Sequence, residues 1–126
     1  MRNVNFVVHV VDPDQAIADG LAILLSTYDI QVVSYPDAES FLQRWEPESP
    51  CHCCLLVEAE LPGLSGPALL QKACKSCNDL PALIFVSASS PELIEAAHQS
   101  SRIGVIEKPC VNGTLIKHVL RLQQHS

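Results

Sequence analysis

The sequence has few charged residues, few aromatic residues and no long hydrophobic run. Charged side chains make up 17% and aromatic side chains 5% of the 126 residues, whereas hydrophobic residues make up 48%. The longest apolar runs are only as long as a strand, which excludes a membrane-spanning helix and predicts a soluble globular domain. A chain of this length buries about two-thirds of the surface that its unfolded form exposes, so folding requires neither a disulfide nor a metal.

Positive charge is also scarce. Eight Lys and Arg residues against 14 Asp and Glu residues give a formal net charge of −6, so we do not expect this domain to bind a nucleic acid backbone directly. Residues 1–6 lack the apolar segment and small-residue cleavage site of a secretory signal, which predicts a cytoplasmic protein. In that compartment the six cysteines are expected to be thiols rather than disulfides.

Short runs rich in Val and Ile recur along the chain, with little alternation between apolar and polar residues. Continuous apolarity predicts strands that are buried on both faces, as in a parallel sheet covered by helices. The predicted strands are Phe6–Val11, Ile30–Tyr35, Cys53–Val57, Ala82–Val86 and Ile103–Ile106.

Segments with helical spacing separate and follow these strands. Asp14, Asp37 and Ser90 each precede such a segment and are predicted to be helix N-caps. Because crossovers between parallel strands are right-handed, the alternation predicts an open, doubly wound α/β sheet with helices on both faces. The predicted helices cover Ile17–Leu25, Ala38–Trp45, Pro67–Lys75, Pro91–Gln99 and Leu115–Leu122.

Polar side chains mark the carboxyl ends of four predicted strands: Asp12, Glu58, Ser87 and Lys108. In open α/β sheets, ligands bind beyond these strand ends. Two acids, a hydroxyl and a lysine suit a site that accepts a phosphoryl group. The acids hold a divalent cation, one carboxylate attacks phosphorus, and the hydroxyl and ammonium groups receive the phosphoryl oxygens.

The segments around these residues resemble the receiver domain of bacterial two-component response regulators, over nearly the whole chain. The matching motifs are Val10-Val11-Asp12, Leu56-Val57-Glu58 with Leu61-Pro62-Gly63 and Gly66, Ile84-Phe85-Val86-Ser87, and Glu107-Lys108-Pro109. The stretches Tyr35–Leu42 and Leu61–Gly66 are most similar to the FixJ-like branch, whose members usually carry a DNA-binding domain after the receiver.

The resemblance implies a fold and a general role. The fold would be flavodoxin-like, with a five-stranded parallel sheet in the order 2-1-3-4-5 and five flanking helices, and residues 1–126 would form one receiver domain. The role would be phosphorelay signal transduction rather than catalysis, so no catalytic residue is predicted. By position, the resemblance makes Asp12 the first acid of the pocket, Ser87 the switch hydroxyl and Lys108 the pocket lysine.

Three positions depart from the pattern of the family. Glu58 stands at the position of the phosphorylated Asp, Pro13 replaces the second metal-binding Asp, and Val105 replaces an aromatic switch residue. Losing the carboxylate at position 13 is expected to weaken or abolish Mg²⁺ binding, since side chains hold this ion weakly. The extra methylene of Glu58 moves its oxygens out of line for phosphoryl transfer. Asp14 fits a helix cap better than a replacement metal ligand.

The departures favour a degenerate receiver that signals by protein–protein interaction without phosphorylation, with Glu58 and Lys108 paired in the pocket. The same pair also fits neutral drift that leaves the lysine compensated. The alternative is a phosphorylatable receiver of a FixJ-like DNA-binding transcriptional regulator whose output domain is absent from this chain, in which Asp14 and Glu60, or Asp12 alone, hold the metal. An acid–base enzyme using Asp12 and Glu58 is a remote third interpretation, because no Gly-rich loop supports it.

The expected partners are a signalling protein or an output domain, and a second copy of the chain. In FixJ-like relatives the fourth helix, the fifth strand and the fifth helix mediate dimerisation, and Ile94, Val105 and Leu115 are candidate contacts. A symmetric dimer there would bury a patch of ordinary size.

Two cysteine clusters, Cys51-His52-Cys53-Cys54 and Cys74 with Cys77, lack the usual spacing of a zinc site. Cys53 and Cys54 are therefore predicted to be core residues. His9, Tyr35 and Trp45 are predicted to serve packing.

Overall fold

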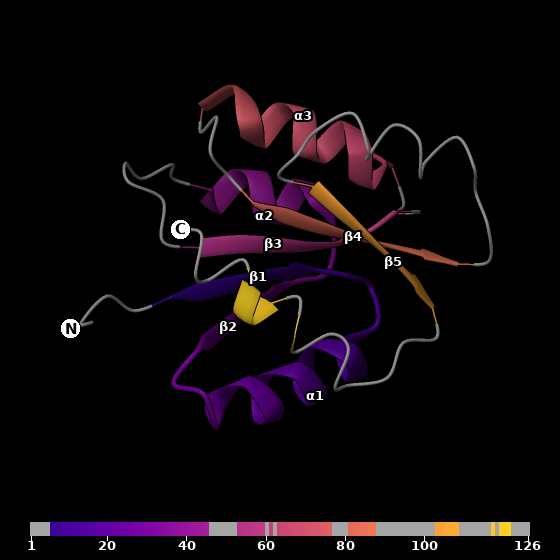
Figure 1. The fold of residues 1–126 in the computed structure, drawn as a ribbon. Helices are drawn as coiled ribbons and strands as arrows, with labels where there is room; N and C mark the ends of the chain where they lie inside the picture. The colour runs from indigo at the N-terminus through magenta and orange to yellow at the C-terminus, as the bar shows by residue number, and fades with distance from the viewer. Residues whose placement is uncertain are drawn as a thin grey trace.

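The protein is described by a computed structural model, which places residues 6–45, 53–59, 61, 63–76, 81–87, 103–108, 117 and 119–121. Strands and helices alternate through most of this part of the chain, as Figure 1 shows. The elements are β1 (Val7–Val11), α1 (Gln15–Ser26), β2 (Gln31–Tyr35), α2 (Ala38–Arg44), β3 (Cys53–Glu58), α3 (Gly66–Ser76), β4 (Ala82–Ser87) and β5 (Ile103–Lys108).

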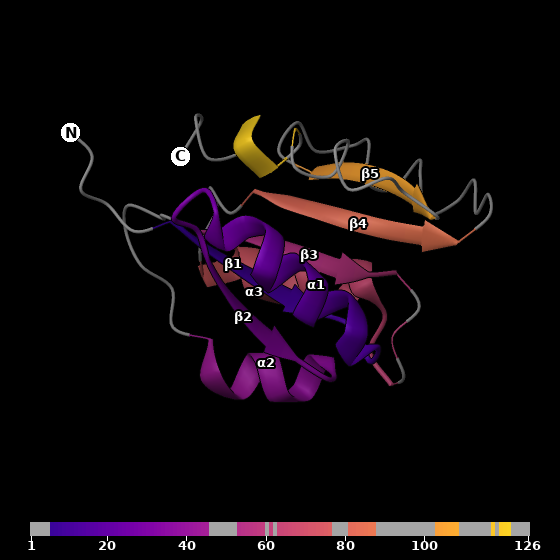
Figure 2. The ribbon, with the colours of Figure 1, turned by 90° about the horizontal axis from the view of Figure 1, so that it is seen from below.

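The strands form one parallel sheet in the order β2-β1-β3-β4-β5. Figure 2 shows β2 and β5 at opposite edges of this sheet. Every residue of the central strand β3 is buried, whereas the edge strand β2 is buried only at Tyr35. The predicted parallel α/β architecture is confirmed, and the exposure of β2 follows from its position at an edge.

Each face of the sheet carries its own hydrophobic core. On one face, side chains of α2 and α3 such as Phe41 and Leu69 pack on the strands. On the other face, Leu21 and Leu25 of α1 pack together with Val119, which lies in the helical residues near the end of the chain. Both faces of the sheet are therefore covered. Polar groups can gather at the ends of the strands.

Two of the predicted N-caps are observed. The carboxylate of Asp14 accepts a hydrogen bond from the backbone N–H of Ala16 at 3.1 Å, and the carboxylate of Asp37 accepts one from the backbone N–H of Ser40 at 2.7 Å. A side-chain acceptor at this position satisfies one of the N–H groups that a helix start leaves without a partner. The caps fix where α1 and α2 begin.

Several predicted boundaries differ from the structure by one or two residues. The strands β3, β4 and β5 extend through Glu58, Ser87 and Lys108, so these residues end the strands rather than follow them. The predicted helix Pro91–Gln99 lies outside the described residues, and of the predicted helix Leu115–Leu122 only Lys117 and residues 119–121 are described. Among the helices that are described, none is long and apolar enough to cross a membrane.

Candidate functional site

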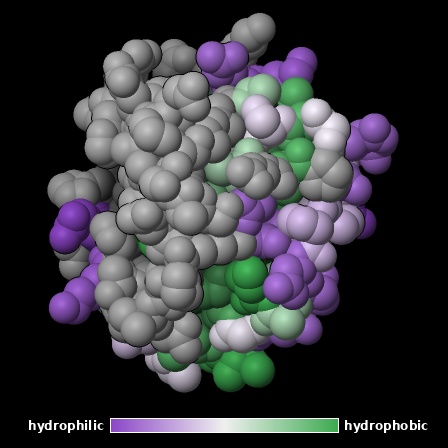
Figure 3. Space-filling model, turned by 90° about the vertical axis from the view of Figure 1, so that its right-hand side faces the viewer, coloured by the Kyte–Doolittle hydropathy of each residue, from purple (hydrophilic) through white to green (hydrophobic). Residues whose placement is uncertain are grey.

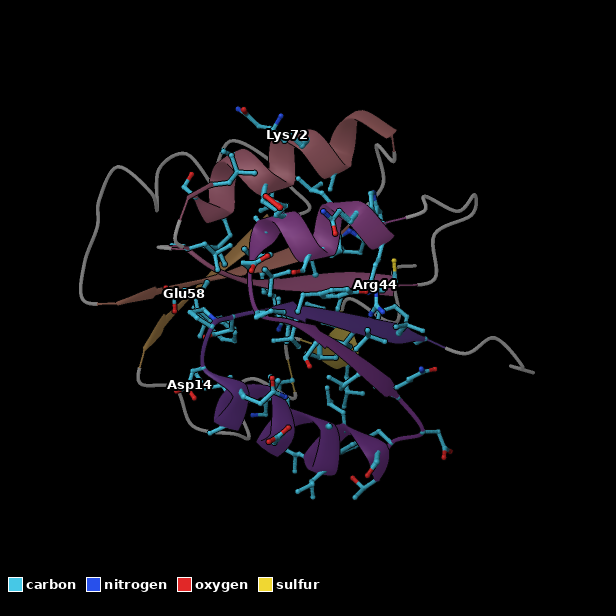
Figure 4. All side chains as sticks on the ribbon, turned by 180° about the vertical axis from the view of Figure 1, so that it is seen from behind. Asp14, Arg44, Glu58 and Lys72 are labelled. Carbon is cyan, nitrogen blue, oxygen red and sulfur yellow. The ribbon has the colours of Figure 1, made fainter. Side chains whose placement is uncertain are left out.

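The carboxyl ends of the strands bring the predicted polar residues to one edge of the sheet. Asp12 directly follows β1, and Glu58 is the last residue of β3, the neighbouring strand. Ser87 and Lys108 are the last residues of β4 and β5 and are paired in register. In Figure 4, Glu58 and Asp14 lie at this same edge of the molecule.

Asp12 is buried and held by the backbone on both sides. Its side chain is only 5% exposed, and its Oδ1 accepts a hydrogen bond from the backbone N–H of Asp14 at 2.8 Å. The backbone N–H of Asp12 donates to the carbonyl oxygen of Tyr35 on β2 at 3.1 Å. A carboxylate that bonds to the backbone two residues later forms an Asx-type turn, so part of its acceptor capacity serves the local structure.

Pro13 and Asp14 add no buried carboxylate to this edge. Pro13 is exposed and offers no side-chain ligand atom, and Asp14 is exposed with its Oδ1 bonded to Ala16 at the start of α1. The interpretation of Asp14 as a helix cap is therefore confirmed.

Glu58 is the second buried acid of the site, with 8% of its side chain exposed. It pairs in register with Phe85 of β4, and the next residue continues the ladder through a hydrogen bond from the Ala59 N–H to the Phe85 carbonyl oxygen at 2.8 Å. Glu58 is thus held by a central strand. The ladder therefore fixes the backbone from which its carboxylate extends.

The turn after β3 closes tightly against Glu58. The backbone N–H of Gly66 donates to the carbonyl oxygen of Ala59 at 2.9 Å. A Cβ atom at position 66 would lie 2.7 Å from the Glu58 carbonyl oxygen and 3.1 Å from a methyl group of Val57. Only glycine fits this close approach, so the residue at position 66 helps to set where the strand ends.

The labelled cations lie away from the acidic edge. Figure 4 places Arg44 at the end of α2, toward the end of the molecule opposite Glu58, and Lys72 on the outer side of α3. Figure 3 looks onto the side where the strands end, and there hydrophilic and hydrophobic residues both reach the surface. In the described part of this edge, the buried acids are Asp12 and Glu58.

The comparisons with known proteins identify the family. The family model of the response regulator receiver domain matches residues 8–120 of this chain. The chain is a response regulator receiver domain. It is 26% identical over 112 residues to the transcriptional regulatory protein FixJ of Azorhizobium caulinodans, covering 89% of this chain and 52% of that protein. It is 29% identical over 109 residues to the C4-dicarboxylate transport transcriptional regulatory protein DctR of Rhodobacter capsulatus, covering 83% of this chain and 53% of that one.

The fold agrees with this assignment. The crystal structure of a CheY-like receiver domain protein from Methanospirillum hungatei superposes with a TM-score of 0.86 at 22% identity, covering 97% of this chain and 96% of that one. The chain spans about half the length of the curated relatives that it matches. Receiver domains are signalling modules, and transcriptional regulators of the FixJ type are among the relatives of this one.

The receiver brings Asp12 and Glu58 to adjacent strands, as the sequence predicts. The backbones of Ser87, Val105 and Lys108 are placed in β4 and β5, but their side chains, and Glu60, lie outside the described residues. Within the described residues, no group of three or more His, Cys, Asp or Glu side chains is arranged to hold a metal ion.

The predicted packing of the described cysteines is confirmed. Cys53 is 8% exposed and Cys54 is fully buried, and they lie in the two hydrophobic cores, one on each face of the sheet. Cys51, Cys77 and Cys110, and the side chain of Cys74, lie outside the described residues.

Sequence reasoning missed a surface groove beside the site. It has a volume of about 610 Å³ and lies between α2 and the turn after β3, lined by Asp37, Ala38, Glu39, Leu42, Gln43, Gly63 and Leu64. Hydrogen bonds from the Ser40 backbone N–H and hydroxyl lower the pKa of the Asp37 carboxyl below its ordinary value. The positive φ of Gly63, 84°, bends the turn that forms one wall. In the sequence, the Pro62-Gly63 pair indicated this turn, but nothing indicated the groove.

Proposed function

We propose that this receiver acts by protein–protein interaction without running an aspartyl-phosphate cycle. The observation that carries the proposal is Glu58, a buried glutamate at the end of the central strand β3, where the family has the phosphorylated Asp. Its strand holds the Cα in place, so the extra methylene displaces the carboxylate by more than a bond length. Phosphoryl transfer depends on in-line placement of the attacking oxygen, and a displacement of about 1 Å is enough to slow it severely.

Mg²⁺, the cofactor that the family implies, fits these residues poorly. Asp12 already accepts the Asp14 N–H, Pro13 supplies no carboxylate, and the described Oδ1 of Asp14 is bonded to the start of α1. Magnesium requires near-octahedral oxygen ligands and is held by few protein carboxylates even in good sites. We expect binding of Mg²⁺ to be weak or lost.

The remaining pocket residues would serve a domain that stays in one state. Lys108 ends β5 and Ser87 ends β4 in direct register, and the longer arm of Glu58 would let its carboxylate pair with the Lys108 ammonium in place of a metal. Val105, in register with Ile84, would replace the aromatic ring that reports the switch in the family. A small aliphatic side chain has no ring to move, which favours a single conformation.

The partner of this degenerate receiver would be a signalling protein, an output domain or a second copy of the chain. The homodimer would use the edge of the sheet at β5, together with Ile94 and Leu115 of the adjoining segments. Sedimentation velocity at several concentrations tests this, since a species that stays monomeric throughout contradicts the dimer.

A second candidate function is a phosphorylatable receiver of a FixJ-like DNA-binding regulator. It is favoured by the length of the curated relatives, FixJ and DctR, which extend to about twice the matched segment and are named as transcriptional regulators. In this version the chain would require a working phosphoacceptor and a cation, and an output domain would read its state.

Mass spectrometry after incubation with acetyl phosphate and Mg²⁺ separates the two candidates. We expect no phosphoryl adduct on the wild type and an adduct on the double variant Glu58→Asp, Pro13→Asp. Glu58→Gln is the matched control, because it keeps the length of the side chain and removes the carboxylate. An adduct on the wild type that is lost in Glu58→Gln would overturn the proposal and favour the regulator.

A further inference from the structure

An aromatic cluster lies on the α2 side of the sheet. It consists of His9 on β1, Tyr35 on β2, Phe41 on α2 and Trp45 just after α2. The His9 ring stacks on Tyr35 at a centroid distance of 5.8 Å and meets the rings of Phe41 and Trp45 edge-on at 6.0 and 5.7 Å. Such spacings are those of favourable ring pairs, so the imidazole is part of the packing.

A hydrogen bond ties His9 to Tyr35. The Nδ1 of His9 lies 3.0 Å from the hydroxyl of Tyr35, and Tyr35 is only 6% exposed. When the imidazole is neutral, Nδ1 can accept the hydroxyl proton. When it is charged, both ring nitrogens carry hydrogen, so Nδ1 has to donate and the hydroxyl has to accept. Protonation of a ring held in this geometry therefore removes the option of accepting at Nδ1 and leaves Nδ1 only as a donor to Tyr35.

Trp45 is held in the cluster by contacts between rings. It is the C-cap residue of α2, with an extended backbone, and its ring stacks on Phe41 at 5.1 Å. Its Nε1 is buried, and within the described part of the chain no acceptor reaches it. A buried N–H without an acceptor is costly, so the tryptophan is held by ring contacts rather than by a hydrogen bond.

The described charged and titratable groups near the cluster lie on α2, β3 and α3. Burial raises the pKa of the Tyr35 hydroxyl, the positive charge of Arg44 at the end of α2 opposes this rise, and Cys53 at the start of β3 adds to it. Lys72 of α3 lies on the outer side of its helix (Figure 4). A proton on His9 would thus lie on a ring that stacks on the face of Tyr35, and aromatic faces attract cations.

We propose that His9 is a proton-operated switch that controls the packing of Trp45 against α2. Protonation fixes Nδ1 as the donor in the His9–Tyr35 hydrogen bond, and the charged ring then takes a different position against the indole. Histidine is the side chain whose ordinary pKa places its change of charge between pH 5 and pH 8. The switch stands apart from Glu58 and does not depend on how that residue functions.

Intrinsic fluorescence tests the switch directly, because Trp45 is the only tryptophan of the chain. A protonated imidazole quenches an indole that it contacts, so we expect emission to fall in one step as the pH drops from about 8 to about 5. His9→Gln should abolish the step, and the matched control His125→Gln should keep it. A flat wild-type titration, or a step that survives in His9→Gln, would overturn the proposal.

A second measurement uses the wild-type protein, so its result does not depend on whether a variant folds. The ¹⁵N chemical shifts of the wild-type imidazoles report the tautomer and charge of His9, and we expect its Nδ1 signal to move with the same midpoint as the fluorescence. Tyr35→Phe should change the amplitude of the step, whereas Tyr28→Phe, at a tyrosine that is 45% exposed, should not. A His9 signal that stays constant over this pH range, or an unchanged step in Tyr35→Phe, contradicts the switch.

Discussion

Replacement of Gly66 by alanine tests how tightly the turn after β3 is built. The new Cβ would lie 2.7 Å from the Glu58 carbonyl oxygen, 3.0 Å from the Ala59 Cα and 3.1 Å from a Val57 methyl group. Two of these three atoms belong to the backbone, which cannot rotate away as a flexible side chain could. Overpacking of this kind costs about 1–3 kcal/mol, and the strand end that carries Glu58 is what has to move.

Urea denaturation measures this cost. With a slope of about 2 kcal/mol per M, a loss of about 2 kcal/mol lowers the midpoint by roughly 1 M. Gly20→Ala is the matched control, since Gly20 lies inside α1 and a Cβ there would meet nothing within 4 Å. Alanine in a helix is more favourable than glycine by about 1 kcal/mol, so this control should raise the midpoint. Equal midpoints for Gly66→Ala and the wild type would refute the argument from close approach.

Three further substitutions, with Asp19→Ala as their control, test the caps and the core. Asp14→Ala should cost about 1 kcal/mol in urea denaturation, because it removes the N-cap of α1, whereas Asp19→Ala on the exposed surface should change stability by less than about 0.5 kcal/mol. Phe41→Ala should cost about 3–5 kcal/mol, since Phe41 is fully buried in the core under α2; a cost near that of Asp19→Ala would contradict its place there. The lowered pKa of Asp37 means that its contribution to stability is present above about pH 4 and is lost as the pH falls through the lowered value. Asp37→Asn should therefore flatten the decline of the urea midpoint between about pH 5 and pH 2, and an unchanged decline would contradict the Asp37–Ser40 bonds as its cause.

The parallel sheet and the helix starts could be predicted because their causes are local in the sequence. The continuous apolar run at Cys53–Val57 indicates a strand buried on both faces, and β3 is buried at every position. Asp14 and Asp37 each stand directly before an amphipathic segment, where a short acceptor side chain is most useful. Neither inference requires knowledge of the rest of the fold.

The details of the site could not be predicted in this way. A charged residue interrupts an apolar pattern, so the predicted strand stops at Val57, whereas pairing with Phe85 on β4 keeps Glu58 in the ladder. The hydrogen bond from the Asp14 N–H to Asp12 depends on the backbone at Pro13. Both features depend on backbone geometry and pairing that residue types alone do not specify.

The aromatic cluster depends on long-range register in the same manner. His9 is a single polar residue in an apolar strand, and the sequence predicts only that it packs near the core. Its neighbours are determined by the pairing of His9 with Val33, which places Tyr35 one pleat further along β2, and by the return of α2 over that face. The register of the strands determines which rings meet, and register cannot be read from residue types alone.

Tyr35 joins the two parts of the molecule for which we make proposals. Its carbonyl oxygen accepts the backbone N–H of Asp12, whereas its hydroxyl bonds to His9. Tyr35→Phe removes only the second contact, because the backbone is unchanged. The variant should therefore alter the fluorescence step of Trp45 and leave the phosphoryl mass spectrum as in the wild type. If Tyr35→Phe changed both the fluorescence step and the mass spectrum, the cluster and the acidic edge would be coupled through β2. The two proposals would then not be independent of each other.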